Sequence, residues 1–373
     1  MVGGSELTSI LLIRLRSIGD VILTTPIVRA LRARFPDARL SYLVEPSAAP
    51  VIERNPHLDE LIVVAKRSGL VRISDDIAVA RRLRRSRFDV AIDLHGGPRA
   101  AWFAWSTGAP TRIGYSIPGR RWMYTHVIER ARDLTPRHAV ANQADLLKPL
   151  GIDGCDPARD PVEVSDDAAA RRRVQDRLGQ LGIGMHDRVA VMHVSANNPF
   201  RRWPAASFAE TAATLAARHP DLHVIVVSGP SEEAAARAIV QQARAVVSTH
   251  RGACAGHAER IVDGHFDLAE LRELVARSAV YIGGDSGPLN LAATTHAPII
   301  EVLGPTLAER AQPWRDPRWF TEVVDAGPLP CRPCHQRHCE PGDFRCLTGV
   351  SADRVVAAAE RALERSGELT EAR

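Results

Sequence analysis

Small and polar residues follow several apolar runs of this sequence, and the densest group is Gly283-Gly284-Asp285-Ser286-Gly287. An apolar run precedes it and apolar residues at helical spacing follow it, which predicts a strand, a tight turn and a helix start. Such a turn leaves backbone N–H groups at the positive end of a helix dipole, where phosphate binds. A second apolar run, residues 298–303, ends in a similar turn, Gly304-Pro305-Thr306. The pair are either adjacent phosphate sites or ordinary connections of a parallel sheet.

A carboxylate, Asp20, closes the segment Arg14–Asp20 between the first apolar run and the first helical pattern. Ligands of open α/β sheets gather at the carboxyl ends of strands, so we expect Asp20 to face a ligand-binding cleft. There it could act as a general base, taking a proton from an attacking hydroxyl. The competing interpretation is that Asp20 caps the helix or balances its dipole.

The loop His193–Pro204 combines hydroxyl, cationic and helix-opening residues after another predicted strand. Ser195 supplies a hydroxyl and Arg201 and Arg202 supply positive charge, while Trp203-Pro204 opens a helix. This combination is typical of a diphosphate site. The alternatives are that Arg202 is a surface cation and that Trp203 only packs in the core.

Two adjacent glutamates, Glu232 and Glu233, follow the apolar run at residues 223–227. A carboxylate at such a turn can accept hydrogen bonds from the two ribose hydroxyls of a nucleotide. Either glutamate could instead be a first-turn helix residue that the dipole favours.

Four cysteines lie close together in the sequence, as Cys331-x2-Cys334-x4-Cys339-x6-Cys346. Four thiols at short spacing suggest a structural zinc site in a cytosolic protein. The spacing differs from that of a two-knuckle zinc site, so free thiols or a redox-sensitive loop are the alternatives.

The elements that must position these residues alternate between strand and helix. Short continuous apolar runs separated by helices indicate a parallel sheet covered on both faces, which is a doubly wound α/β fold. Strands are expected at residues 9–15, 39–44, 61–64, 88–94, 188–194, 223–227, 280–283 and 299–303. Helices are expected at residues 20–34, 75–87, 205–218, 231–244, 268–277 and 351–363.

The chain of 373 residues is too long for one compact core and suits two domains of roughly 150 residues each. Proline, glycine and aspartate gather without periodicity at residues 153–167, where we expect the linker. We therefore predict domains at residues 1–160 and 161–350, followed by a helical tail, 351–373, that packs back on the first domain.

Charge is distributed unevenly, because residues 1–165 hold 24 basic and 18 acidic residues and the remainder holds 24 and 26. The arginines at residues 81–87 could meet an anionic membrane surface or could reflect base composition. Aromatic residues do not interleave with them, which disfavours nucleic-acid binding. No apolar run reaches the roughly 18 residues of a membrane span, and we expect a cytoplasmic protein.

Five motifs in order resemble glycosyltransferase family nine, the bacterial lipopolysaccharide heptosyltransferases. These are SIGD at 17–20, NPFRRWP at 198–204, DSGPLNLAA at 285–293, GPT at 304–306 and CRPC at 331–334. The resemblance implies a GT-B fold of two Rossmann-like domains and inverting transfer of heptose. It implies ADP-heptose as donor, the lipopolysaccharide inner core as acceptor, and a peripheral position at the inner face of the inner membrane.

The resemblance also assigns residues, and no metal enters the reaction it implies. Asp20 matches the catalytic base. Arg201 stands where the family usually has a lysine, and Asn290 where it places a histidine. The remaining donor-binding matches are Ser195, one of Glu232 and Glu233, Asp285, Ser286 and Gly287, and the acceptor candidates are Arg99 and Arg120.

An amide at Asn290 can donate a hydrogen bond to phosphate but carries no charge and transfers no proton. Two alternatives therefore stay open. One is a family-nine enzyme that uses a different nucleotide sugar, and the other is a non-catalytic protein that binds a nucleotide or lipopolysaccharide.

Overall fold

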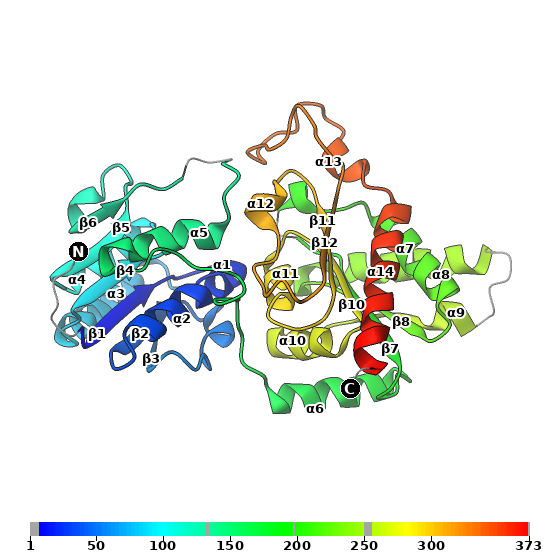
Figure 1. Cartoon of the computed structure of the whole chain (residues 1–373), viewed down its shortest axis with the longest axis horizontal. Helices are drawn as coiled ribbons and strands as arrows, with labels where there is room; N and C mark the ends of the chain where they lie inside the picture. Colours follow the sequence, from blue (N-terminus) through cyan, green and yellow to red (C-terminus); the bar gives the residue numbers. More distant parts are fainter. Residues whose placement is uncertain (1–6, 132–134, 197, 250–255, 372–373) are drawn as a thin grey trace. The chain divides into compact units, whose positions relative to one another are not determined.

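The computed structural model describes residues 7–131, 135–196, 198–249 and 256–371 (Figure 1). The chain divides into two compact units. Unit 1 comprises the residues up to Ser165 together with Trp314–Asp316, and unit 2 comprises Asp166–Pro313 and Pro317–Arg373.

Unit 1 is built on a six-stranded sheet of order β3-β2-β1-β4-β5-β6 in which all paired strands are parallel. Its strands are β1 (Ser9–Ile13), β2 (Arg39–Val44), β3 (Glu60–Val63), β4 (Val90–Asp93), β5 (Thr111–Tyr115) and β6 (His126–Ile128). Its α-helices are α1 (Ile18–Ile22), α2 (Thr25–Arg34), α3 (Gly69–Arg85), α4 (Pro98–Ser106) and α5 (Ala139–Ala144). Short 3₁₀ helices are η1 (Ala49–Val51), η2 (Arg121–Met123) and η3 (Asp145–Leu150).

Unit 2 repeats this topology with the order β12-β11-β10-β7-β8-β9, again with parallel pairs. Its strands are β7 (Arg188–His193), β8 (Leu222–Val227), β9 (Ile261–Gly264), β10 (Val280–Gly284), β11 (Ile299–Leu303) and β12 (Thr321–Asp325). Its longer helices are α6 (Ala168–Gln180), α7 (Ala205–Arg218), α8 (Glu233–Thr249), α10 (Leu268–Arg277) and α14 (Ala352–Glu371). Shorter ones are η4 (Pro199–Arg201), η5 (Pro230–Glu232), α9 (Gly256–Glu259), α11 (Gly287–Ala292), α12 (Ala308–Ala311) and α13 (Arg345–Thr348).

In each sheet the first three strands along the chain are added toward one edge and the next three toward the other edge, as in a doubly wound dinucleotide-binding fold. This reversal of the strand order lies between β1 and β4 in unit 1 and between β7 and β10 in unit 2. Ligands of such sheets bind at the carboxyl ends of the strands beside this point. The predicted doubly wound α/β fold is confirmed, and the reversal marks one candidate site in each unit.

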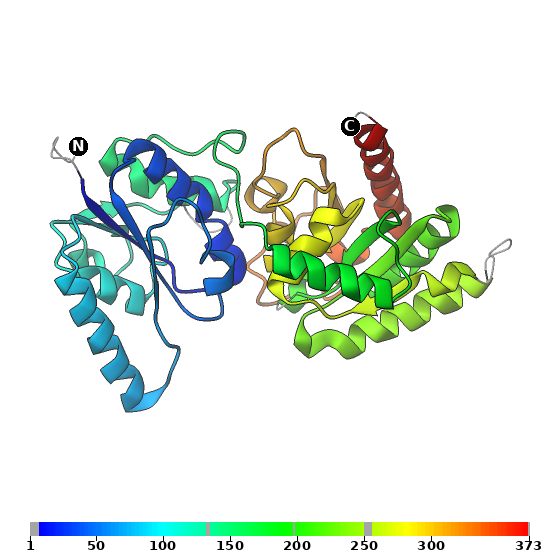
Figure 2. The ribbon, with the colours of Figure 1, turned by 90° about the horizontal axis from the view of Figure 1, so that it is seen from below.

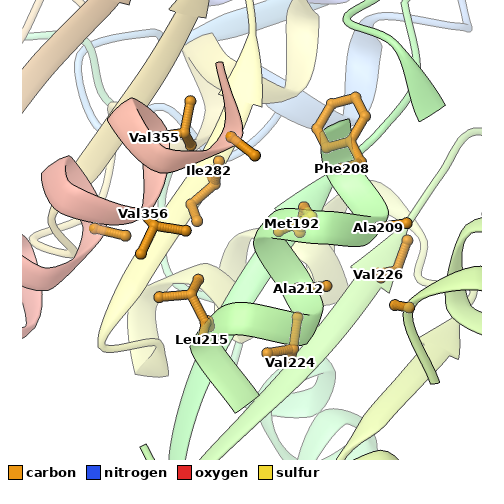
Figure 3. Close-up of a cluster of buried hydrophobic side chains, with 14 of the residues drawn as sticks. Met192, Phe208, Ala209, Ala212, Leu215, Val224, Val226, Ile282, Val355 and Val356 are labelled. Carbon is orange, nitrogen blue, oxygen red and sulfur yellow. The ribbon is translucent and has the colours of Figure 1, made fainter. Parts of the chain in front are cut away.

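The apolar character of the strands accounts for the cores. Every residue of β1, β4, β10 and β11 is buried, as expected for parallel strands covered on both faces. In unit 2, side chains of α7 and α14 meet over Met192, Val224, Val226 and Ile282 of the strands (Figure 3).

Helix α14 differs from the expected tail, because it packs within unit 2, against α7, β10, β11 and β12 (Figure 1). Its buried face of Val355, Val356, Ala359 and Leu363 covers the apolar surface of that sheet. The amphipathic pattern fixes which side of a helix is buried but not which sheet it covers. The predicted packing on the first domain is therefore wrong, and the tail is part of unit 2.

The unit boundary falls after Ser165 rather than at residue 160, and Trp314–Asp316 rejoins unit 1. The Trp314 ring packs against His138 at 4.8 Å between centroids, and its Nε1 donates to the carbonyl of Asp160 at 2.8 Å. The Trp314 carbonyl accepts from the amide of Val162 at 3.2 Å. These contacts hold Trp314–Asp316 against the rest of unit 1.

Candidate functional site

The turn after β10 lies where the strand order of unit 2 reverses. Its carboxylate, Asp285, pairs with Arg201 of the loop that follows β7. Arg201 Nη1 lies 3.0 Å from Asp285 Oδ2. The Thr306 hydroxyl, from the turn after β11, donates to the same oxygen at 3.1 Å. Three segments expected to bind diphosphate therefore converge on one carboxylate.

Gly284 allows this convergence, because a Cβ there would lie 3.2 Å from the carbonyl oxygen of Arg201 and 3.5 Å from that of Val302. The first distance is tighter than ordinary carbon–oxygen contact, and the oxygen belongs to backbone that cannot turn aside. The small residue is needed here for close approach of two loops.

Ser286 precedes helix α11 as its N-cap residue, with φ −152° and ψ 171°, but its side chain makes no capping bond. The Ser286 hydroxyl oxygen is buried and has no hydrogen-bond partner in the described part of the chain. Gly287 and Pro288 begin the helix, and Asn290 lies in the same turn, where its backbone N–H donates to the Ser286 carbonyl at 3.3 Å. A buried hydroxyl without a partner is suited to accept or donate one bond to a ligand.

Ser195 and Glu232 lie together at the ends of β7 and β8. The Ser195 hydroxyl accepts from the amide of Gly229 at 3.0 Å, and a Cβ on Gly229 would lie 3.7 Å from Glu232 Oε2. Glu232 Oε1 pairs with Arg202 Nη2 at 2.7 Å, and the Arg202 side chain is 47% exposed, so Arg202 is a surface cation that pairs with Glu232.

Glu233, in contrast, begins α8, and its carboxylate lies 3.4 Å from His265 and 3.8 Å from Arg237. The two glutamates that the sequence left equivalent thus have different surroundings, and Glu232 is the one beside Ser195. Trp203 is 4% exposed, stacks edge-on with Phe208 and donates to the Val350 carbonyl at 2.9 Å, which confirms its core role.

A row of buried polar side chains underlies the turn and was missed in the sequence. Parallel pairing sets Gly283 beside His193 on one side and Glu301 on the other. The Tyr281 hydroxyl fills the space over Gly283, 2.7 Å from where a Cβ would stand. The only sequence signal is a glutamate inside the apolar run of β11.

These buried groups are held neutral. Burial, followed by the neighbouring charge of Asp285, raises the pKa of Glu301 well above its usual value. Burial lowers the pKa of His193 to about 4 and raises that of Tyr281. Neither oxygen of Glu301 has a hydrogen-bond partner among the residues described.

In unit 1, Asp20 lies in the first turn of α1, beside the strand reversal. Its Oδ2 is 2.6 Å from Arg14 Nη2, and its side chain is 44% exposed. The N-cap of this helix is Ser17, so Asp20 is not the capping residue. Arg14 also donates to the carbonyl oxygens of Leu94 at 2.7 Å and Arg16 at 3.1 Å, which fixes its guanidinium beside the carboxylate.

The end of β4 supplies the other polar groups of this site. Asp93 is fully buried and accepts from the amides of His95 and Gly96 at 2.8 Å and from the Tyr124 hydroxyl at 2.6 Å. Burial, followed by the charges of Arg14 and Arg16, lowers the pKa of His95 to about 4. The imidazole is therefore neutral at pH 7.

The two predicted acceptor arginines differ in their surroundings. Arg120 donates to the carbonyl of Gly96, directly beside the β4 turn. Arg99 pairs with Glu45 at 2.7 Å and with Asp76, and it donates to the Ala65 carbonyl at 2.8 Å. These internal partners occupy the Arg99 guanidinium.

The four clustered cysteines carry free thiols and are half-buried. Burial, together with the neighbouring thiols of Cys334, Cys331 and Cys339, raises the pKa of Cys346. Within the described ranges, no set of three or more His, Cys, Asp or Glu side chains is arranged to hold a metal ion. The zinc interpretation of this cluster gains no support from the geometry.

A family model and several named relatives show which family this chain is similar to. The model of glycosyltransferase family 9 (heptosyltransferase) matches residues 77–343. Lipopolysaccharide heptosyltransferase 3 of Escherichia coli is 24% identical over 355 residues, covering 93% of this chain and 97% of that protein.

Two solved structures extend the likeness to the fold. A family 9 glycosyl transferase from Veillonella parvula is 25% identical with a TM-score of 0.79, over 96% of this chain and 98% of that one. The E. coli ADP-heptose lipopolysaccharide heptosyltransferase II has a TM-score of 0.73 at 17% identity, over 96% and 100%. The expected GT-B fold is thereby confirmed.

Proposed function

The chain belongs to glycosyltransferase family 9, and from this premise we propose that it transfers a heptose from ADP-heptose to the inner core of lipopolysaccharide. The observation that carries the proposal is the convergence of Arg201, Asp285 and Ser286 at the strand reversal of unit 2. Relatives across nearly the whole chain are lipopolysaccharide heptosyltransferases by name, which supports the sugar and the acceptor class.

The donor diphosphate is proposed to bind at the turn after β10. Arg201 supplies positive charge, the Ser286 hydroxyl supplies a buried hydrogen-bonding group, and the first-turn amides of α11 have no partner within the helix. Groups fixed in this way stabilise the negative charge that develops on departing ADP. Glu232, beside Ser195, is proposed to accept from the ribose hydroxyls, in exchange for part of its pairing with Arg202.

Asp20 is proposed as the general base. Its carboxylate removes the proton from the acceptor hydroxyl as the hydroxyl oxygen bonds to the anomeric carbon and the bond to the ADP oxygen breaks. A single displacement of this kind inverts the configuration at that carbon. Arg14, at 2.6 Å, orients the carboxylate, and the partly exposed side chain is open to an incoming hydroxyl.

The charge that metal ions supply in many phosphate-transfer enzymes is proposed to come here from Arg201 and hydrogen-bond donors. We therefore propose that the reaction needs no metal ion or other cofactor. Measuring transfer in the presence of a chelator tests this.

We propose that unit 1 binds the lipopolysaccharide acceptor at the cytoplasmic face of the inner membrane. Helix α3 is a long helix of unit 1 (Figure 2), and its Val71 and Ile73 are each 50% exposed. Arginines of the same helix, at 81, 84 and 85, are also exposed. Apolar and basic residues on one helix suit an anionic lipid surface. None of the described helices is long and apolar enough to cross a bilayer.

Two experiments test the proposal. Transfer assays with ADP-, GDP- and UDP-sugars would identify the donor, and turnover with none of them would leave only a binding role. Mass spectrometry of lipopolysaccharide from a strain that lacks this chain would identify the missing sugar. Loss of a residue other than heptose would contradict the proposal.

A different donor sugar is the second candidate, because Asn290 stands in the α11 turn where the family has histidine. Asn290→His should raise the ADP-heptose rate if Asn290 merely weakens the site. It should lower the rate if Asn290 is matched to another sugar.

A further inference from the structure

Gln336, in the cysteine-rich segment Cys331–Cys346, contacts both the Arg201 loop and the turn after β11. Gln336 Oε1 accepts from Arg201 Nε and from Asn198 Nδ2, each at 2.8 Å. Gln336 Nε2 donates to the Thr306 hydroxyl oxygen at 3.3 Å. A single amide therefore joins the Arg201 loop to the turn after β11.

These contacts close a ring of four side chains. Thr306 donates onward to Asp285 at 3.1 Å, and Asp285 pairs with Arg201 at 3.0 Å. Arg201 is thus held through Nε by Gln336 and through Nη1 by Asp285, while Nη2 makes no hydrogen bond within the described part of the chain. A guanidinium fixed at two nitrogens presents the third in one direction, which suits a phosphate oxygen.

The segment that carries Gln336 is itself fixed to the turn. Arg332 donates through Nε and Nη2 to the Thr306 carbonyl at 3.0 and 2.8 Å, and its Nη1 pairs with Asp325 at 2.6 Å. The amide of Cys334 donates to the Pro305 carbonyl at 3.3 Å. Only 5% of the Arg332 side chain is exposed. Gln336 is therefore presented from a rigid base rather than from a loose loop.

The chemical type of the residue is also informative. An amide oxygen accepts from Arg201 without adding charge, whereas a carboxylate at the same place would be a second anion beside Asp285. The site would then oppose a diphosphate. We propose that Gln336 is a positioning residue for the nucleotide diphosphate, which holds the Arg201 guanidinium in place while leaving its charge available. This inference rests on the proposed function, because the diphosphate belongs to the donor.

Calorimetric titration of the full chain with ADP tests the proposal without an acceptor. Gln336→Ala should weaken ADP binding about tenfold, since it removes a hydrogen bond to a charged group. Gln336→Glu should weaken it more, about a hundredfold, since it adds like charge. Raising the salt concentration should narrow the gap between the two variants, because only the second loss is Coulombic.

His338→Ala is the matched control, since His338 is an exposed residue of the same segment, and it should bind ADP as the wild type does. Arg201→Ala should lose affinity at least as much as Gln336→Ala. Thermal unfolding of each variant shows whether the fold is intact.

The possible results distinguish failure of the Gln336 role from failure of the proposed function. If the wild type binds no ADP, the proposed donor fails, and the role of Gln336 fails with it. If Arg201→Ala weakens binding while both Gln336 variants bind normally, only the role of Gln336 is overturned. Equal losses in the Ala and Glu variants with no salt dependence, accompanied by lower melting temperatures, would indicate a structural residue and also overturn it.

Discussion

Asp20→Asn is the substitution that most directly tests the proposed chemistry. Asparagine keeps the shape of the side chain and can still contact Arg14, but it cannot accept a proton from the acceptor. Loss of a positioned general base lowers rates by roughly 10²–10⁴-fold. At about 1.36 kcal/mol per factor of ten, this is about 3–5 kcal/mol of transition-state stabilisation.

The stability cost of the same change is much smaller. The Asp20 side chain is 44% exposed, and a solvent-accessible ion pair contributes about 0–1 kcal/mol. Arg14 also keeps its bonds to the carbonyl oxygens of Leu94 and Arg16. Against a typical unfolding free energy of about 5–15 kcal/mol, such a loss leaves nearly all of the protein folded. A large rate loss must therefore come from the chemistry.

The assay is single-turnover transfer from ADP-heptose to a truncated lipopolysaccharide, with urea unfolding of the same samples. Asp37→Asn, at an exposed carboxylate of the same unit, is the matched control and should keep the full rate. Asp20→Glu should keep part of the rate, since it retains a carboxylate. A folded Asp20→Asn enzyme that keeps more than one tenth of the wild-type rate would refute the assignment of the base.

Three further changes test other parts of the structure. Glu301→Gln should flatten the pH dependence of the unfolding free energy measured with urea. Burial raises the pKa of Glu301 in the folded protein. The stability that its neutral form contributes is therefore fully present below the pKa of the unfolded chain and is lost as pH rises through the pKa of the folded protein. An unchanged profile would contradict this. Trp203→Ala should lower the unfolding free energy by about 3–5 kcal/mol and Trp203→Phe by about 1–3 kcal/mol, because the second keeps an aromatic ring in the core and loses a smaller volume together with the bond to the Val350 carbonyl. Incubation with EDTA should leave the transfer rate unchanged, and loss that Mg²⁺ restores would refute the metal-free scheme.

The sequence predicts the central strands well because each is a short continuous apolar run. It misses the inner strand β5, and it also misses β6, β9 and β12, which lie at sheet edges. The residues of these edge strands are mostly only half-buried, so the apolar signal that marks central strands is weak there. The expected helix at residues 20–34 is divided into α1 and α2, and Pro26 lies in the first turn of the second of these.

The candidate site was predictable where chemistry follows a strand in sequence. Asp285 and Arg201 were identified from their own motifs, and the structure brings them within 3.0 Å of each other. Gln336 lies 135 residues after Arg201, in a segment whose cysteines drew attention to metal binding instead. Glu301 is a single residue in an apolar run, and only the strand register brings it beside Gly283. Contacts between residues far apart in the chain depend on the sheet topology, which the local sequence pattern does not encode.

The return of Trp314–Asp316 to unit 1 affects how the protein is made. The ribosome must add about 150 residues after Ser165 before Trp314 emerges to meet His138 and Asp160. At roughly 5–20 residues per second, unit 1 waits about 8–30 s for its last segment. Its completion is thus tied to synthesis of its neighbour, and a gene fragment ending at Ser165 would encode a lobe that lacks this closing tryptophan.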